Sequence, residues 1–236
     1  MRQFRPLVFV LLVVLAFGAV VAASASARKA TPGITPSNVL FTDKSGVSVF
    51  AGGSVVSGSK VECATSESTG GFLTSLTGTF DLLFLGCLVK ITSVLYLCTG
   101  SNDKVSSSIL VLGTFVLRYR EPTPSTKTVA AFLITPVKFE CVASGSPNKT
   151  IEVMGCAAGE VTPVNKAVVT GEHFTVFMTK SASADRNEIT KIETETGSTE
   201  ETCQLLANEN GGTFKEAAEG TTDEIVGNVS SAEIQA

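Results

Sequence analysis

The residues most able to do chemistry in this 236-residue sequence are six cysteines. No two of them are closer than Cys87 and Cys98, which ten residues separate. Zinc sites and thioredoxin-type motifs use much closer cysteine pairs. The even number and wide spacing therefore predict structural disulfides, formed in an oxidising compartment. The candidates are Cys63, Cys87, Cys98, Cys141, Cys156 and Cys203.

The connectivity of these cysteines is open at the level of sequence, because six cysteines allow 15 pairings. Residues 88–97 form a stretch long enough to turn back on itself, which would bring Cys87 beside Cys98. Closing that loop contributes about 3 kcal/mol in a chain-entropy treatment. We predict a Cys87–Cys98 bond, with Cys63–Cys141 as its complement.

The sequence contains few of the residues and motifs that enzymatic catalysis would need. His173 is the single histidine, no Gly-x-Ser-x-Gly nucleophile elbow occurs, and the chain has no Trp and two Tyr. A hydrolase triad would need His173, and a sugar-binding cleft normally uses aromatic surface. We therefore predict a protein that is not an enzyme, with no catalytic residue, no cofactor and no metal site.

The N-terminus has the organisation of a secretory signal peptide. Arg2 and Arg5 precede an apolar stretch, Leu7–Val21, and Ala25-Ser26-Ala27 follows as an A-x-A cleavage pattern. The alternative is a membrane-anchoring helix, for which this stretch is at the lower limit of length. The small residues at its end favour cleavage between Ala27 and Arg28. We expect a secreted or cell-envelope-associated protein with no membrane segment after cleavage.

Charge is distributed unevenly along the remainder. Residues 28–180 carry 13 basic and 10 acidic residues, whereas residues 181–236 carry 3 basic and 12 acidic residues, a net charge of −9. Such an acidic segment is unsuited to nucleic acid or anionic lipid. A solvated surface is one interpretation and weak Ca²⁺ binding is the other, but no D-x-D-x-D-G loop occurs.

Short apolar runs with a period of two predict an all-β fold, an antiparallel β-sandwich or barrel stapled by disulfides. Helical periodicity is weak, and residues 200–208 are the one plausible turn of helix. Pro136 predicts a bend or bulge in its strand. Residues 28–45 are expected to be an irregular lead-in to a single β domain at 46–236. The expected strands are 47–50, 60–63, 76–85, 90–98, 108–119, 128–142, 150–154, 159–164 and 172–180.

The acidic segment 181–236 has a different texture, rich in Ser, Thr, Glu, Asn and Gly. Asn210-Gly211-Gly212 is a strong turn signal. A disordered tail is one interpretation, but apolar residues such as Leu205 and Phe214 recur through the segment. We expect a C-terminal hairpin segment of ordered strands with mobile loops.

Several motifs resemble a family of small exported actinobacterial proteins without an assigned activity. They are Thr79-Phe80 with Gly86-Cys87, Phe139-Glu140-Cys141, the run from Gly159 to Lys166, and Asn210 to Ala217. The resemblance covers residues 60–236 and implies secretion and β structure. Cys156 and Cys203 depart from the family pattern. We predict that they form an added pair that fastens the acidic segment to the β core.

The function expected from these features is that of an exported, non-enzymatic structural or interaction protein. Its partner would be another protein or a cell-envelope component, and its oligomeric state is left open. The alternative is a small-molecule carrier with an apolar cavity inside a barrel, because residues 90–98 and 108–119 are apolar on both faces.

Overall fold

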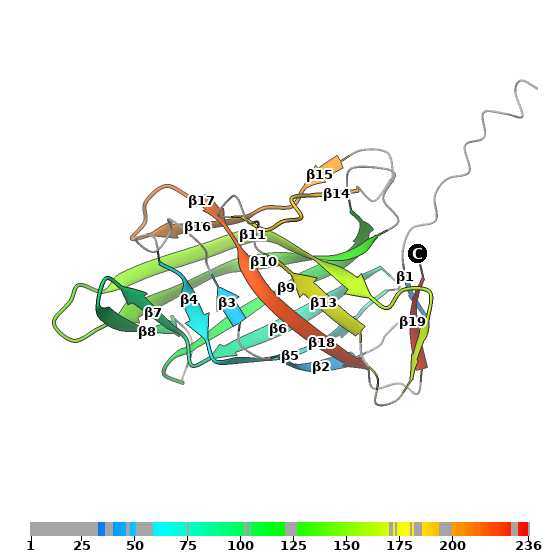
Figure 1. Cartoon of the computed structure of the whole chain (residues 1–236), viewed down its shortest axis with the longest axis horizontal. Helices are drawn as coiled ribbons and strands as arrows, with labels where there is room; N and C mark the ends of the chain where they lie inside the picture. Colours follow the sequence, from blue (N-terminus) through cyan, green and yellow to red (C-terminus); the bar gives the residue numbers. More distant parts are fainter. Residues whose placement is uncertain are drawn as a thin grey trace, which may run out of the picture. The chain divides into compact units, whose positions relative to one another are not determined.

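The computed structural model describes most of the chain after residue 32 (Figure 1). The predicted signal peptide, the cleavage site at Ala27 and Arg28, and His173 all lie outside the described residues. Contacts divide the chain into residues 1–30 and a compact unit of residues 31–236. The described residues are 33–35, 40–45, 48–50, 59–74, 76–101, 103, 105–120, 127–169, 172, 174–179, 181, 186–193, 200–227 and 231–235.

Every regular element among these residues is a β-strand, and all pairings are antiparallel, as predicted. The strands of the first half are β1 (Gly33–Thr35), β2 (Leu40–Ser45), β3 (Ser48–Phe50), β4 (Val61–Cys63), β5 (Thr65–Phe72), β6 (Thr77–Leu85), β7 (Leu88–Ile91), β8 (Val94–Gly100) and β9 (Ser108–Tyr119). Those of the second half are β10 (Thr128–Val142), β11 (Lys149–Thr162), β12 (Ala167–Val169), β13 (Phe174–Met178), β14 (Lys191–Glu193), β15 (Glu200–Thr202), β16 (Leu205–Glu209), β17 (Lys215–Ala217), β18 (Glu219–Gly227) and β19 (Ser231–Gln235).

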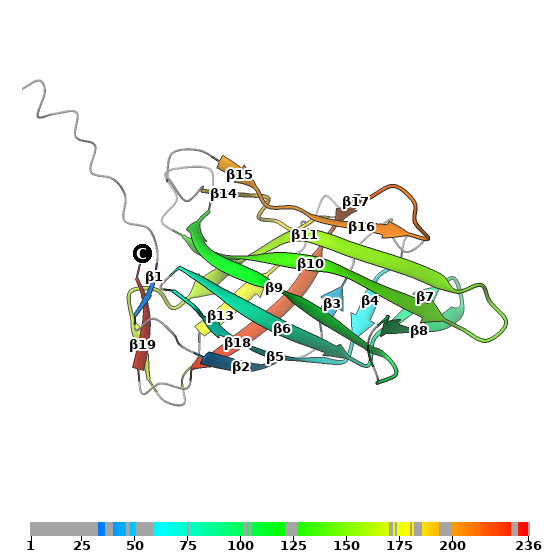
Figure 2. The ribbon, with the colours of Figure 1, turned by 180° about the vertical axis from the view of Figure 1, so that it is seen from behind.

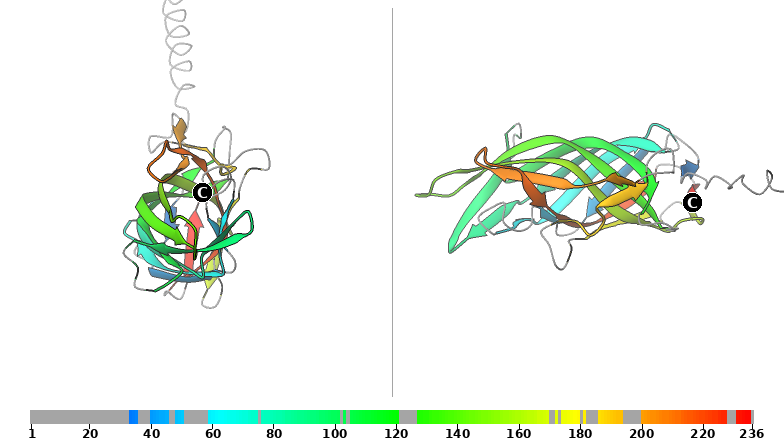
Figure 3. Two further views of the ribbon diagram at one scale, coloured as in Figure 1. Left: turned by 90° about the vertical axis from the view of Figure 1, so that its left-hand side faces the viewer. Right: turned by 90° about the horizontal axis from the view of Figure 1, so that it is seen from above.

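The central sheet closes on itself. Its order is β11-β13-β18-β2-β5-β6-β9-β10, and β10 also pairs with β11. These strands surround a common axis (Figure 3, left). Of the two predicted arrangements, sandwich and barrel, this pairing is that of a barrel. A small sheet of β1, β19 and β12 adjoins one end of the barrel, and β3, β4, β7 and β8 extend the wall toward the other (Figure 2).

Side chains point alternately inward and outward along each strand, and the inward ones fill the barrel interior. In β9, Ile109, Val111, Phe115 and Leu117 are buried in the main core, whereas Leu110 points outward and is exposed. The Phe72 and Phe115 rings meet edge to face with centroids 4.7 Å apart, a favoured aromatic geometry. The strand pattern predicted for residues 76–85 and 108–119 is therefore confirmed.

Glycines in neighbouring strands make room for these rings. Gly78 lies directly opposite Phe115, and Gly113 directly opposite Phe80. A Cβ on Gly113 would lie 2.3 Å from the Leu133 carbonyl oxygen and 2.7 Å from the Phe80 ring. Each ring therefore occupies space that any larger residue on the facing strand would need.

Some predicted elements differ in detail from the structure. The expected single strand at 90–98 is a hairpin, because Thr92 adopts a positive φ of 58° and reverses the chain. The two strands expected at 150–154 and 159–164 are one strand, β11, in which Gly155 has a φ of 108°. The register shift in β10 between Ile134 and Val137 confirms the bulge predicted at Pro136.

Two further expectations were wrong. Residues 200–208 contain strands β15 and β16 instead of a helical turn, because Leu205 and Ala207 alternate inward and pair with β11. The lead-in 28–45 is not wholly irregular, since β2 pairs with β5 and β18. The acidic segment, in contrast, is ordered as predicted where it is described, with strands β14 to β19.

The disulfides are Cys63–Cys87, Cys98–Cys141 and Cys156–Cys203. The Cys156–Cys203 prediction is confirmed, but Cys87–Cys98 and Cys63–Cys141 were wrong. Strands β4 and β10 flank the β7–β8 hairpin, so Cys63 faces Cys87 and Cys141 faces Cys98. Cys63 and Cys141 are three strand spacings apart, about 14 Å, which is too far for a bond.

Candidate binding groove on the outer face

Part of the acidic segment crosses the outer face of the barrel. We call residues 186–193 and 200–203 the covering segment. Ile189 and Ile192 are buried against outward-facing residues of β9, β10 and β11, which form a second small core. Figure 1 shows β14 and β15 on the outside of this wall. The second core consists of Val116, Val129, Ala131, Cys156, Ala158, Ile189, Ile192 and Cys203.

Three kinds of contact hold the covering segment in place. The Cys156–Cys203 disulfide joins its end to β11. The Asn187 side-chain amide donates to the Glu219 carbonyl at 2.7 Å and accepts from the Glu219 amide at 3.3 Å. Arg120 bridges to Ile192 through the backbone. The covering segment is therefore fixed at both ends of its described part.

An ionic cluster lies beside this segment on the barrel wall. Lys127 Nζ contacts the two Glu160 carboxylate oxygens at 2.9 and 3.0 Å, and Arg120 pairs with both Glu160 and Glu188. Burial alone raises the pKa of Glu160, but the hydrogen bonds and charges of Lys127 and Arg120 lower it below its ordinary value of 4.5. Glu160 is therefore held in its charged form.

The edge of the covering segment leaves a groove of about 500 Å³ on the outer face. That volume lies within the range of small-molecule sites, about 300–1,000 Å³. Its lining comes from β6, β9, β10, β11, β14 and β15, and from Leu73, which follows β5. The lining residues are Leu73, Thr77, Gly78, Thr114, Phe115, Val116, Arg118, Ala131, Leu133, Cys156, Ile192, Glu201 and Thr202.

Arg118 is the unusual member of this lining. It points outward from β9, but its exposed fraction is only 8%. Its Nη1 donates to the Leu117 carbonyl at 3.1 Å, and its buried Nε has no hydrogen-bond partner among the described residues. A guanidinium buried with an unused donor is costly and uncommon. The groove thus combines apolar walls with a cation that has hydrogen-bonding capacity to spare.

The described side chains of the barrel interior enclose far less space. An apolar cavity of about 20 Å³ lies among its side chains, room for about one water molecule. Its lining includes Leu117, Phe132, Val161 and Val176. Among the cavities defined by described residues, the larger space is therefore outside the barrel.

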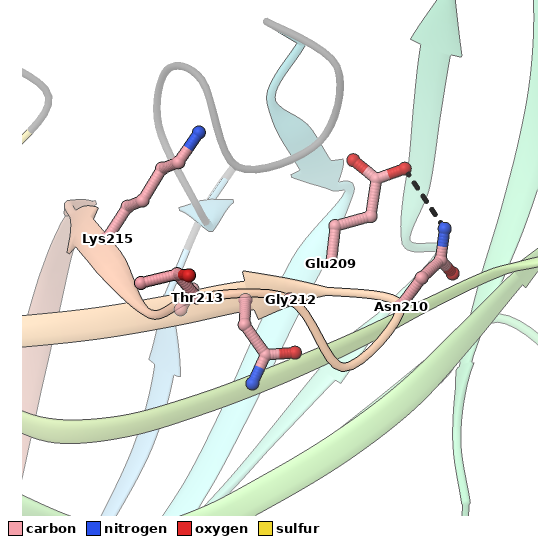
Figure 4. Close-up of a pocket in the computed structure, with 7 residues that line it drawn as sticks. Glu209, Asn210, Gly212, Thr213 and Lys215 are labelled. Atoms are coloured by element: carbon pink, nitrogen blue, oxygen red, sulfur yellow. Dashed lines mark hydrogen bonds between the residues drawn. The ribbon is translucent and has the colours of Figure 1, made fainter.

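A second concave region lies at the turn between β16 and β17. Its volume is about 290 Å³. Figure 4 shows Glu209, Asn210, Thr213 and Lys215 around it, with a hydrogen bond of 3.5 Å from Asn210 to Glu209. Lys149 Nζ also contacts Glu209, at 2.7 Å. Asn210 and Gly211 both have positive φ, which confirms the predicted turn and accounts for the shape of this surface.

The residues singled out in the sequence do not themselves form the groove, apart from Cys156. Four of the six cysteines are buried in the main core. In the described part of the chain, no group of three His, Cys, Asp or Glu side chains is placed to hold a metal. Arg118 was missed, because an outward arginine in a strand normally faces solvent, and the covering segment that lines the groove with it is distant in the sequence.

The three disulfides indicate an oxidising environment. The described residues also contain no helix of a length and hydropathy suited to crossing a membrane. Neither a known protein family, a curated protein nor a solved structure matches the chain. The class of protein that the fold defines is a disulfide-stapled antiparallel β domain.

Proposed function

We propose that this chain is an exported, non-enzymatic interaction protein that binds a component of the cell envelope through the outer-face groove. The observation that carries the proposal is the contrast between a groove of about 500 Å³ and a cavity of about 20 Å³ among the described side chains of the barrel interior. Binding sites are normally concave and largely apolar, with a few polar groups that orient the ligand. The groove fits that description.

A binding role without catalysis agrees with the groove's chemistry. Its described lining offers threonine hydroxyls, one arginine and one glutamate, and its cysteine is bonded to Cys203. Nucleophilic catalysis needs a nucleophile activated by an adjacent base. This lining holds neither a histidine nor a free thiol.

Export is supported by the N-terminal sequence and by the disulfides. An Ala25-Ser26-Ala27 pattern after an apolar stretch directs cleavage before Arg28. The intact mass of the protein recovered from the culture medium or envelope should correspond to residues 28–236. A membrane-bound species that retains residues 1–27 would contradict export by cleavage.

The second candidate function is the carrier with a cavity inside the barrel. Its support is the closed ring of strands around an apolar interior. The 20 Å³ cavity favours the groove over the interior as the binding site. A carrier would have to displace core side chains such as Phe115 and Phe132 to admit a ligand.

Site-specific photo-crosslinking tests the proposal. Leu133, in the groove, and Phe177, on β13, are exposed to similar degrees, 46% and 42%. A photoreactive phenylalanine analogue at position 133 should capture an envelope component from the native envelope, identified by mass. The same analogue at position 177 is the matched control. Equal capture at both positions, or none at 133, would contradict the proposal, and capture of a protein would reassign the partner.

A further inference from the structure

We infer that the groove binds an amphiphilic carboxylate, with Arg118 holding the carboxylate group and the apolar walls holding a short hydrocarbon body. This inference rests on the proposed function, because it names the chemical class that the groove would accept. It also has separate support in the surroundings of the Arg118 side chain.

Arg118 is the cation of the groove. More than nine-tenths of Arg118 is buried, and its Nε has no partner among the residues that the structure describes. Among the described residues, its guanidinium donates one hydrogen bond, to the neutral carbonyl of the preceding residue. A carboxylate can accept two parallel N–H bonds from a guanidinium, and such charge-assisted bonds are about twice as strong as neutral ones. A carboxylate in the groove would therefore neutralise the Arg118 charge and accept hydrogen bonds from the part of the guanidinium that lines the groove.

The apolar lining of the groove indicates that the ligand also has an apolar part. Leu73 and Leu133 are exposed at the groove, and Val116 and Ile192 also line it. Covering exposed apolar area is worth about 25 cal/mol per Å². A ligand that is only a small anion would leave these leucines in water. An apolar body attached to the carboxylate uses the whole groove.

Glu201 and Arg118 together determine which anions the groove accepts. Glu201 is the one acidic side chain in the described lining, and it is exposed at the surface. Its repulsion of an anion is screened by solvent, whereas Arg118 acts in a poorly solvated position. One anionic group can therefore be accepted, but a second negative charge placed near Glu201 would be disfavoured. A free fatty acid of short to medium chain has this chemistry.

Calorimetric titration of the mature protein with three ligands of equal chain length tests the inference. The ligands are octanoate, octanol and octylammonium. Each charge-assisted bond to Arg118 should favour octanoate over octanol by about tenfold or more in Kd. Octylammonium should bind no better than octanol. Equal affinities for octanoate and octanol, or a preference for the cation, would overturn the inference.

Substitution of Arg118 tests whether this residue causes the preference for octanoate over octanol. Arg118→Gln should weaken octanoate binding to the level of octanol and leave octanol binding unchanged. Lys60→Gln, which removes a cation from an exposed ion pair with Glu62 outside the groove, is the matched control and should change neither. If Arg118→Gln fails to fold, the comparison of the three ligands with the unmodified protein decides. Octanoate selectivity that survives Arg118→Gln would contradict the role of Arg118.

The two proposals fail in different ways. If octanoate and octanol bind equally, the groove remains a binding site and the assignment to Arg118 is wrong. If none of the three ligands binds, the carboxylate inference is wrong, and crosslinking at position 133 still decides the proposed function. Capture at 133 without octanoate binding would mean that the partner has a different chemistry.

Discussion

Cys87, directly before β7, and Cys98, on β8, lie side by side, and the Cys98 amide donates to the Cys87 carbonyl at 3.0 Å, yet no disulfide joins the two. Each is bonded to a cysteine on its other neighbouring strand. The four cysteines Cys63, Cys87, Cys98 and Cys141 therefore lie at matching register positions across four adjacent strands. Cys87 and Cys98, the inner two of the four, therefore each have two cysteines close enough to form a disulfide.

This arrangement predicts a specific disulfide map. Peptide mapping under non-reducing conditions should recover Cys63 linked to Cys87 and Cys98 linked to Cys141. In the double variant Cys63→Ser/Cys141→Ser, the remaining Cys87 and Cys98 should bond to each other, because strand pairing already places them side by side. Two free thiols in a folded double variant would contradict the register.

The third disulfide should control how firmly the covering segment is attached. Cys156 and Cys203 are 47 residues apart in sequence, and closing such a loop is worth about 4 kcal/mol in a chain-entropy treatment. Replacing both with Ser should speed proteolysis within residues 181–210 well before the barrel is cut. Limited proteolysis followed by mass spectrometry measures the rate, and equal rates for the variant and the parent would contradict the anchoring role.

The sequence predicted the class of fold because most strands carry their own signal. The alternation of Phe80 and Leu82 with Thr79 and Asp81 specifies a strand and its buried face without reference to any other element. The β7–β8 hairpin lacks such a signal, because its turn places Thr92 in the left-handed region, where glycine or asparagine is usual. Continuity of β11 through Gly155 was equally hidden, because a glycine there suggests a break.

The groove could not be predicted from the sequence for a different reason. Its walls come from β6, β9, β10, β11, β14 and β15, which only the pairing of the sheet and the crossing of the covering segment bring together. Arg118 precedes Tyr119 in a strand that is apolar on both faces, and nothing local distinguishes it from an arginine exposed to solvent. The pairing of Cys156 with Cys203 was the single sequence signal that connected the covering segment to the wall.

Close packing at the glycines of the barrel should make it intolerant of a single added methyl group. Gly113→Ala would place its Cβ 2.3 Å from the Leu133 carbonyl oxygen, so β9 and β10 would have to separate. We expect a loss of about 1–3 kcal/mol in the free energy of unfolding, typical of overpacking. Chemical denaturation measures it, and an unchanged midpoint would show that the strands are not this close.

The lowered pKa of Glu160 predicts how stability depends on pH. A carboxylate whose pKa is lower in the folded state stabilises the fold above its ordinary value of 4.5, and this contribution is lost as the pH falls through the lowered pKa. Glu160→Gln should therefore reduce stability at neutral pH and flatten its decline in acid. Lys127→Gln should act in the same direction by removing one partner. Denaturation curves with the parent's acid dependence in both variants would contradict this.

An NMR titration that locates the bound ligand is the most direct test of the groove as the binding site. Methyl-labelled protein would be titrated with octanoate and followed by NMR. We predict shifts at Val116, Leu133 and Ile192, which line the groove, and none at the methyl groups of the interior cavity. Shifts confined to Leu117, Val161, Val176 and Ile234 inside the barrel would contradict the groove as the binding site and identify the protein as an internal carrier.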